Sequence, residues 1–408
     1  MKKVLTKSLI LRHLYFSGKL SSTELGERLD KSVPFVNKIL AGLISENMIY
    51  EKGLAGSTGG RRPVNYAIVA ELAYIVAVSV DQRYTRIAII DMNRKIVFPI
   101  AEFNLILKDN TNALEQLGTN IAGVIKQSGI GKQKLLGIGI GMPGFIDVNK
   151  GINYTFFQGQ SVTEYVSGVT GLPVFIDNDS SVIALAELKF GAAVGKRNAM
   201  VVNMTWGVGL GMVVNGELVR GENGFAGEFS HIPLFTNNKL CSCGKNGCLE
   251  TEASLQVIVE KAIEGLQSGV STSLKGLTAD DYEKSCEAVI DAAAKGDRFA
   301  VQLVSQVGYH IGRGVAILIH LFNPSTIILS GRGATAGKIW RAPIQQALNE
   351  YCIPRLADGT VLEISAIGAE AEIIGAAALV MEHFSTVAIK KQFFPETEEN
   401  EFSPLGNE

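Results

Sequence analysis

The sequence predicts an α/β protein with a small helical head and a larger body made of two similar α/β units. Short amphipathic helical patterns fill the first fifty residues, and strand-like apolar runs alternate with helical stretches from Ala73 onward. A similar order of runs starts again at Ala199. With 408 residues, of which 47% are hydrophobic and 19% charged, the chain has the apolar material for two or three domains. The expected divisions are a head over 1–70, a first half over 71–195, a second half over 196–388, and an acidic, disordered tail over 389–408.

Charge is distributed unevenly along the chain. Residues 1–66 hold 11 lysines and arginines against 5 acidic residues, a balance of +6, whereas the rest of the chain carries −8. A basic head on an acidic body indicates that the head meets a polyanion. A merely solvated, lysine-rich terminus is the alternative that charge alone leaves open.

Neither a signal peptide nor a membrane span is expected. The N-terminus runs straight into an amphipathic helical pattern. The longest apolar run, Val315–Phe322, contains His320 and is too short to cross a bilayer. We therefore expect a cytoplasmic protein without a membrane partner, a setting in which thiols stay reduced.

Three helical patterns in the head fit a helix-turn-helix, because the turn between the second and third is very short. The first covers about 3–16 and the third about 32–45. The second begins with Ser21-Ser22-Thr23-Glu24, which fits a capping box flanked by the hydrophobic staple Leu20 and Leu25, and ends near Asp30. The apolar positions that share a helical face are Leu5, Leu9, Ile10 and Leu14 in the first helix and Val36, Ile39, Leu40 and Leu43 in the third.

The segment after the third helix predicts a wing. A strand at Ile49–Lys52 is followed by a glycine-rich loop that ends in Arg61 and Arg62, and by a second strand at Val64–Ile68. Glycines let a loop approach DNA closely, and arginines enter the minor groove or bind phosphate; a flexible interdomain linker is the alternative. With the three helices this predicts a winged helix-turn-helix. The expected DNA-binding residues are Ser32, Val33, Phe35, Asn37, Lys38, Arg61 and Arg62.

The body predicts two units of one design, each a strand hairpin followed by helix and strand. In the first unit the strands are expected at 74–81, 86–91, 135–144 and 174–179, with helices over about 113–127 and 180–190. In the second they are expected at 199–204, 212–214 and 326–330, with a long helical region over about 254–322. Glycine-rich turns close the hairpins and strand ends. This duplication is typical of an actin-like, sugar-kinase-like (ribonuclease H-like) body.

A group of three cysteines and a histidine predicts a structural zinc site. His231, Cys241, Cys243 and Cys248 lie within eighteen residues, flanked by Glu228 and Glu250. Three thiolates and one imidazole complete a tetrahedral shell and leave no open position for catalysis. Chance clustering and a disulfide are the alternatives, and a Cys-x-Cys pair is poorly placed for a disulfide.

The motifs resemble those of the ROK family, named for its repressors, open reading frames and sugar kinases. The spacing Glu-x-x-His followed by Cys-x-Cys-x4-Cys-x-Glu matches the zinc loop of that family. Asp177-Asn178-Asp179 with the following Ala184–Glu187 resembles its sugar-site strand and helix. The winged head with Gly59–Pro63 resembles the repressor branch, which includes regulators of glucose, xylose and N-acetylglucosamine use.

The resemblance implies a sugar site and a role for each of its residues. In kinase members the position of Asp179 is the general base that activates a sugar hydroxyl; an N-cap on the following helix is the alternative for this residue. The loop over 153–160 does not match the asparagine with which the family contacts sugar. The residues expected to contact sugar are Gly144, Asn178, Asp179, Glu228, His231 and Glu250.

The nucleotide side departs from the kinase pattern, so we do not expect ATP to bind. Where kinases carry Asp-x-Gly-Gly-Thr, this chain has Asp81–Thr85 without either glycine. Glycines there let backbone N–H groups approach phosphate. In the second phosphate turn a tryptophan, Trp206, stands at a threonine position, although Gly331 is retained in the adenosine-side turn.

These features predict a sugar-responsive, DNA-binding transcriptional regulator, a repressor of carbohydrate uptake or catabolism genes. Its expected partners are a double-stranded DNA operator, a monosaccharide or sugar-phosphate effector, and a second copy in a homodimer or homotetramer. Control by a regulatory protein instead of a sugar is a further possibility. The alternative function is an ATP-dependent hexose or N-acetylhexosamine kinase with Asp179 as its catalytic residue.

Overall fold

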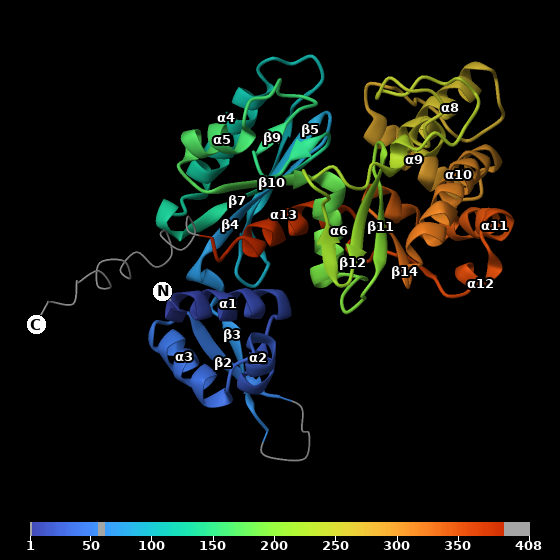
Figure 1. The fold of residues 1–408 in the computed structure, drawn as a ribbon. Helices are drawn as coiled ribbons and strands as arrows, with labels where there is room; N and C mark the ends of the chain where they lie inside the picture. The colour runs from blue at the N-terminus through green and yellow to red at the C-terminus, as the bar shows by residue number, and fades with distance from the viewer. Residues whose placement is uncertain (1, 56–61, 387–408) are drawn as a thin grey trace, which may run out of the picture. The chain divides into compact units, whose positions relative to one another are not determined.

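A computed structural model describes residues 2–55 and 62–386 of the chain (Figure 1). The N-terminal head holds three helices and a three-stranded antiparallel sheet with the strand order β1-β3-β2. This confirms the winged helix-turn-helix. The elements of the head are α1 (Lys2–Ser17), β1 (Leu20–Ser21), α2 (Ser22–Leu29), α3 (Val33–Ser45), β2 (Ile49–Leu54) and β3 (Val64–Ile68).

The start of α2 forms as the sequence predicts. The Ser21 hydroxyl accepts a hydrogen bond from Glu24 N (3.3 Å), and the Glu24 carboxylate accepts one from Ser21 N (2.7 Å). Leu20 and Leu25 are buried on either side of this capping box. Asp30 ends the helix in the left-handed conformation, with φ 52°.

Helix α1 buries only part of the face that its spacing predicts. Leu5 is 40% exposed, whereas Ile10 and Leu14 are buried together with Leu11 and Tyr15. The buried stripe is therefore wider toward the second half of the helix, where α1 packs on α2, α3 and β3. The apolar spacing of the helix therefore does not by itself show that Leu5 is exposed.

Internal contacts divide the chain into two compact units. Unit 1 runs to Asn178 and resumes at Ala376, and unit 2 covers Asp179–Gly375. The domain boundaries at 70, 195 and 388 remain predictions, and the acidic tail at 389–408 lies outside the described residues. None of the described helices combines the length and the apolarity that a bilayer span requires.

Besides the head, unit 1 contains a five-stranded sheet with the order β10-β7-β4-β5-β6. Strands β4, β5 and β6 form an antiparallel meander, and β4, β7 and β10 are parallel. Its elements are η1 (Ala70–Leu72), β4 (Tyr74–Val80), β5 (Tyr84–Asp91), β6 (Ile96–Asn104), α4 (Ala113–Ser128), η2 (Lys132–Lys134), β7 (Leu135–Met142), β8 (Ile146–Asp147), β9 (Ile152–Asn153), α5 (Val162–Thr170) and β10 (Val174–Asn178).

Strand β7 shows why this sheet is covered on both faces (Figure 1). Ile138 and Ile140 join the core formed with α4 and α5. Gly137 and Gly139 alternate with them and face α13, where a Cβ at Gly139 would overlap the backbone carbonyl of Ala376. A strand buried on both faces needs a continuous apolar sequence, and its glycines let a helix backbone approach the sheet.

Unit 2 contains a second five-stranded sheet with the order β13-β12-β11-β14-β15. Its elements are α6 (Asp179–Phe190), β11 (Ala199–Met204), β12 (Val208–Val214), β13 (Glu217–Val219), η3 (Phe229–His231), α7 (Glu250–Ala253), α8 (Leu255–Gln267), α9 (Tyr282–Ala294), α10 (Arg298–Phe322), β14 (Thr326–Ser330), η4 (Arg332–Trp340), α11 (Arg341–Tyr351), α12 (Pro354–Ala357), β15 (Val361–Ile364), η5 (Gly368–Glu370) and α13 (Ala371–Glu382), which ends in unit 1.

The two sheets share one topology. In unit 2, β11, β12 and β13 form the antiparallel meander, and β11, β14 and β15 are parallel. They correspond in order to the meander β4, β5 and β6 and to the parallel strands β4, β7 and β10 of unit 1. The expected duplication is therefore confirmed. One large apolar core lies between this sheet and α8, α9 and α10, and a smaller one lies beneath α6.

The long helical region expected over 254–322 consists of three helices. Ser254 caps α8, Asp281 caps α9 and Asp297 caps α10, each through its side chain. The apolar periodicity predicts the helices correctly. The interruptions are set by these polar caps and by Gly269 and Gly296, both at positive φ.

Candidate functional site

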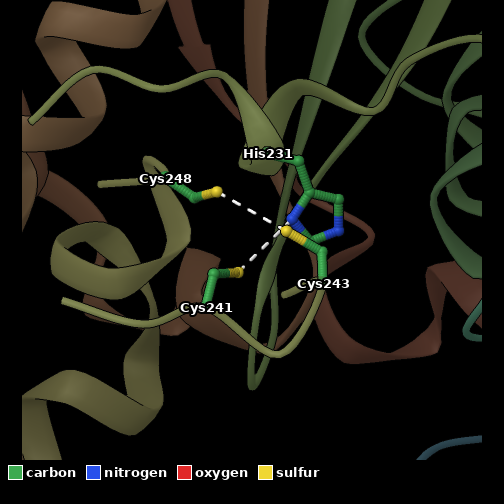
Figure 2. A group of neighbouring side chains, drawn as sticks. All are labelled: His231, Cys241, Cys243 and Cys248. Atoms are coloured by element: carbon green, nitrogen blue, oxygen red, sulfur yellow. Dashed lines mark hydrogen bonds between the residues drawn. The ribbon is translucent and has the colours of Figure 1, made fainter. Parts of the chain in front are cut away.

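The four predicted metal ligands come together in unit 2. His231, Cys241, Cys243 and Cys248 place one ligand atom each within 4.8 Å of one another. Figure 2 shows their side chains converging from η3 and from the loop that precedes α7. The sequence therefore predicts this group correctly, and the group can hold a metal ion.

The distances in the group fit tetrahedral zinc. Cys243 Sγ lies 3.6 Å from Cys248 Sγ, and Cys241 Sγ lies 3.5 Å from His231 Nδ1. Zinc bonds of ordinary length and tetrahedral angles would put two sulfurs about 3.8 Å apart, and sulfur and nitrogen about 3.5 Å apart. Burial and the neighbouring thiols raise the pKa of Cys248 to about 12, so a cation is needed if all the thiols are to be thiolates together.

Backbone contacts fix the cysteine loop. Cys241 N donates to Lys245 O (2.8 Å) and Gly244 N donates to Cys241 O (2.9 Å), which closes the turn that carries Cys243. Gly247 has φ 74°, and a Cβ there would overlap the carbonyl of Phe235. These contacts fix the backbone conformation in which the loop presents Cys243.

Arg313 of α10 anchors the segment between His231 and the cysteines. Its guanidinium lies 4.8 Å from the ring centre of Phe235 and 5.1 Å from that of Tyr351, and it donates to Leu234 O (3.3 Å). A cation between two aromatic faces is a stabilising arrangement. The sequence motif does not reveal Arg313, which lies about eighty residues downstream.

Two carboxylates flank the metal group, as the motif predicts. Glu228 precedes η3, and its Oε2 lies 3.7 Å from His231 Nε2, the ring nitrogen that faces away from the cysteines. Desolvation by burial, together with Glu250, raises the pKa of Glu228, while His231 opposes the rise. Glu250 begins α7, and a Cβ at Gly207 would lie 3.0 Å from its Oε2.

Asp179 begins α6 with its carboxylate held by two neighbours. Asp179 Oδ1 accepts from Ser180 N (2.7 Å), and Oδ2 accepts from the side-chain amide of Asn203 (3.4 Å). Burial, and then the nearby carboxylates Glu372 and Glu228, raise the pKa of Asp179 to about 7. A carboxyl group that titrates near neutral pH can both accept and donate hydrogen bonds to sugar hydroxyls.

Asn203 and Glu372 are the parts of this group that the motif analysis missed. Asn203 is 1% exposed at the end of β11, and Glu372 is 6% exposed at the start of α13. Asn203 gives a usable sequence signal, because it is a polar residue inside the apolar run Ala199–Met204. Glu372 gives none, since it is far away in sequence and lies outside any recognised motif.

In unit 1 the structure brings Asn178 and Gly144 together. The Asn178 amide donates to Gly144 O (3.3 Å) at the carboxyl ends of β10 and β7. Gly144 has φ 104°, and a Cβ there would lie 2.8 Å from Thr155 Oγ1, so only glycine fits this turn. This is the edge of a parallel sheet where ligands bind in α/β proteins.

The side chain of Asn153 holds the turn that contains Gly144 through hydrogen bonds. Its amide donates to Pro143 O (2.9 Å), its side-chain oxygen accepts from Thr155 N (3.0 Å), and its side chain is fully buried. Both ends of the amide are thus used within the protein. Asn153 therefore fixes the backbone of the turn that carries Gly144.

Five of the predicted DNA-binding residues lie at the start and along the outer face of α3. Ser32, Phe35, Asn37 and Lys38 are exposed, and Val33 is half-buried. Arg62 is exposed beside β3, whereas Arg61 lies outside the described residues. Ser32 makes no side-chain cap hydrogen bond.

Comparison with known proteins supplies the family. The ROK family model matches residues 75–383, which are most of the chain and nearly all of the body. The chain belongs to the ROK family. A glucokinase from Halalkalibacterium halodurans is 36% identical over 281 residues, which cover 67% of this chain and 83% of that protein.

Regulators of the ROK family match the chain over nearly its whole length. A xylose repressor from Bacillus spizizenii is 28% identical over 389 residues, which cover 94% of this chain and 96% of that protein. The crystal structure of a ROK family transcriptional regulator, a homologue of the E. coli MLC protein, covers 96% of this chain and 97% of its own, with a TM-score of 0.76 and 26% identity. These matches include the winged head and support the repressor branch of the family.

Proposed function

We propose that this ROK protein is a sugar-responsive transcriptional regulator that represses genes for carbohydrate uptake or catabolism. The observation that carries the proposal is a winged helix-turn-helix on the same chain as a ROK body whose sugar-type carboxylates and amide are retained. The full-length similarity to a xylose repressor supports it. Because thiolate metal ligands need a reducing compartment, we place the protein in the cytoplasm.

DNA would be bound by the head. Helix α3 would enter the major groove, where Asn37 can pair with base edges and Lys38 with phosphate. Phe35, exposed on the same face, suits a thymine methyl group, while Arg61 and Arg62 of the wing would contact the minor groove or the backbone. Ser32 and Val33 at the helix start complete the proposed contact surface.

The residues proposed to bind sugar hydroxyls are carboxylates, an amide and an imidazole. Unit 1 offers the Asn178 amide at the Gly144 turn. Unit 2 offers Asp179 and Glu228, with the Nε2 side of His231 and the Glu250 carboxylate close by. Carboxylates and amides suit sugar hydroxyls because each can pair with neighbouring donors and acceptors.

Structural zinc would hold the candidate sugar-binding residues of unit 2 in place. With Nδ1 of His231 on the metal, Nε2 would stay available to Glu228 or to a sugar hydroxyl. The metal would thereby fix the orientation of the imidazole and of both flanking carboxylates. Four protein ligands leave no position for a reactive water, so its role would be structural.

Regulation would follow from a change in affinity for DNA when the sugar binds. A homodimer or homotetramer would place two heads on a palindromic operator. The protein would exchange between a conformation with high affinity for DNA and one with low affinity. A sugar or sugar phosphate shifts this equilibrium only if it binds one of the two conformations more tightly than the other. A regulatory protein partner could act on the same equilibrium.

DNA binding with and without sugars tests the proposal directly. The full-length protein is titrated in gel-shift assays against DNA from upstream of its own gene, at modest salt, and the complex is challenged with a panel of sugars and sugar phosphates. We expect a sequence-preferring complex whose affinity changes with one class of sugar. Equal affinity for unrelated DNA of the same length would contradict the proposal.

A sugar kinase is the second candidate, because Asp179 stands at the position of the catalytic base and a glucokinase is 36% identical over the body. A coupled assay for ADP release, run over common hexoses and N-acetylhexosamines, distinguishes the two functions. Turnover that disappears in Asp179→Asn would establish the kinase. We expect no sugar-dependent ADP release.

A further inference from the structure

Two turns that correspond to the phosphate-binding turns of kinases are filled by groups of the chain itself. The first is the β4–β5 turn of unit 1 and the second is the β11–β12 turn of unit 2. A phosphate bound at such a turn needs backbone N–H groups that point at it and no competing acceptor. The hydrogen bonds at each turn show whether those groups are available.

In the first turn a carboxylate takes the place that a phosphate would need. Asp81 Oδ1 accepts from Arg83 N and from Tyr84 N, both at 2.7 Å, and Asp81 N donates to Tyr84 O at 2.9 Å. An incoming phosphate would have to displace this carboxylate from two N–H groups while meeting its negative charge. The turn is therefore closed as an anion site.

The second turn is closed by an aromatic side chain and by its backbone contacts. Thr205 N donates to Gly207 O (3.2 Å), and Trp206 O accepts from Gln256 N at the start of α8 (3.3 Å). The Trp206 ring packs edge-on against Tyr282, with ring centres 6.1 Å apart. The indole that follows Thr205 is therefore packed against α9.

Arg332, which follows the neighbouring strand β14, also packs against Trp206 of the second turn. It follows Gly331 at the carboxyl end of β14, and its guanidinium lies 5.8 Å from the centre of the Trp206 ring. It also forms an ion pair with Glu283 in the first turn of α9, and its side chain is only 16% exposed. The carboxyl ends of parallel strands β11 and β14 thus carry a packed group where ligands bind in related folds.

The glycines of this hairpin have a packing reason that does not involve phosphate. Gly209 and Gly211 lie within β12, and a Cβ at either would overlap Ser180 or Ala184 of α6. They let α6, which begins with Asp179, lie directly on the strand. A glycine-rich sequence therefore persists here without a nucleotide.

We infer that Trp206, Tyr282, Glu283 and Arg332, called here the Arg332 cluster, form an internal plug that replaces a nucleoside triphosphate and fastens α9 to the sheet of unit 2. This goes beyond the proposed function, because it makes the effector response independent of ATP. Cation–π contact and an ion pair of low exposure hold the cluster without any bound anion.

A charge swap across the ion pair tests the plug. Arg332→Glu and Glu283→Arg are each expected to lower the melting temperature of the full chain by about 2 °C or more, and the double variant is expected to recover most of the loss. Arg355→Ala, an exposed arginine of α12, is the matched control and should leave the melting temperature unchanged. The inference would be overturned if the single variants melted at the wild-type temperature. It would also be overturned if the double variant melted no higher than the single variants.

A milder pair of variants keeps the test usable if the charge reversals do not fold. Glu283→Gln and Arg332→Lys should each speed amide hydrogen exchange in the first turns of α9 without altering exchange in α3. Unchanged exchange in α9 would contradict the fastening role. These readouts do not depend on DNA or sugar binding, so they succeed or fail independently of the proposed function.

A second experiment measures nucleotide binding directly. Calorimetry of the wild type with magnesium ATP and with a non-hydrolysable ATP analogue should detect no saturable binding, in the presence or absence of each sugar of the panel. Stoichiometric nucleotide binding by the wild type would overturn the inference even if the charge swap behaved as expected.

Discussion

The side-chain amide of Asn203 donates hydrogen bonds to Asp179 Oδ2 (3.4 Å) and to Ser180 Oγ (3.1 Å), and so connects the end of β11 to the start of α6. Ser180 in turn donates to Asp179 Oδ1 through both its backbone N–H and its hydroxyl. The carboxylate proposed to meet the sugar is thus oriented by two neighbours before any ligand arrives. This arrangement favours recognition of a defined hydroxyl geometry.

Asp179 makes stability depend on pH near neutrality. Its pKa is about 7 in the folded chain, against an ordinary value of 3.8. Between these values the folded protein retains a proton that the unfolded chain has lost, so stability falls as pH rises from about 4 to about 7. Over this pH range the free energy of unfolding of Asp179→Asn should fall by a few kcal/mol less than that of the wild type. Denaturant midpoints measured at several pH values report this difference.

The contribution of Asp179 can be separated from that of other titrating groups. The difference in stability between wild type and Asp179→Asn should be largest above pH 7, where the buried charge is fully formed, and should shrink toward pH 4. A difference that stays constant over the whole range would mean that Asp179 titrates as an ordinary aspartate.

Loss of one cysteine should release the metal. We expect Cys243→Ser to lose most of its zinc, measured by mass spectrometry of the purified protein, and to lose the thermal response to sugar, because structural zinc contributes on the order of 10 kcal/mol to local folding. Cys352→Ala, a buried cysteine outside the group, is the control and should keep its zinc. Equal zinc content in wild type and Cys243→Ser would refute the site.

Removal of the capping box should lower the free energy of unfolding of the head. Ser21→Ala deletes the acceptor for Glu24 N and should cost about 1 kcal/mol in the urea unfolding of the head. Thr23→Ala, an exposed position in the same helix, should change stability by less than about 0.5 kcal/mol. If the two variants are equally stable, the cap contributes nothing.

The two wing arginines should act through phosphate or the minor groove. Arg61→Ala combined with Arg62→Ala should weaken operator binding and reduce the slope of log affinity against log salt by about 2, because each lost phosphate contact removes about 1. Sugar-induced thermal stabilisation should be unchanged. Fluorescence anisotropy at several salt concentrations measures the slope, and a slope equal to that of the wild type would exclude these contacts.

Much of the fold could be predicted because its signals are local. The capping box at Ser21, the apolar positions of α3 and the strand runs at 74–81, 135–144 and 199–204 each depend on neighbours in sequence. The metal group could also be predicted, since three of its ligands lie within eight residues and the fourth is ten residues away.

The remaining features depend on tertiary contacts that the sequence does not reveal. Arg313 of α10 contacts Phe235 beside the cysteine loop, and Glu372 of α13 raises the pKa of Asp179. The strand is predicted only over 212–214, yet Gly209 and Gly211 already lie inside β12, where α6 packs on them. Leu5 shows the same limit, since periodicity predicts which face is apolar but not how far a neighbour covers it.

The central claim, that sugar recognition in the body controls DNA binding by the head, is tested most directly by measuring both in one titration. A sugar that raises the melting temperature of the wild type is added to the protein–operator complex while anisotropy reports the dissociation constant. We predict that the constant changes by about 5-fold or more at saturating sugar, and that Asp179→Asn loses both effects together. A sugar that stabilises the protein but leaves operator affinity unchanged would contradict the account.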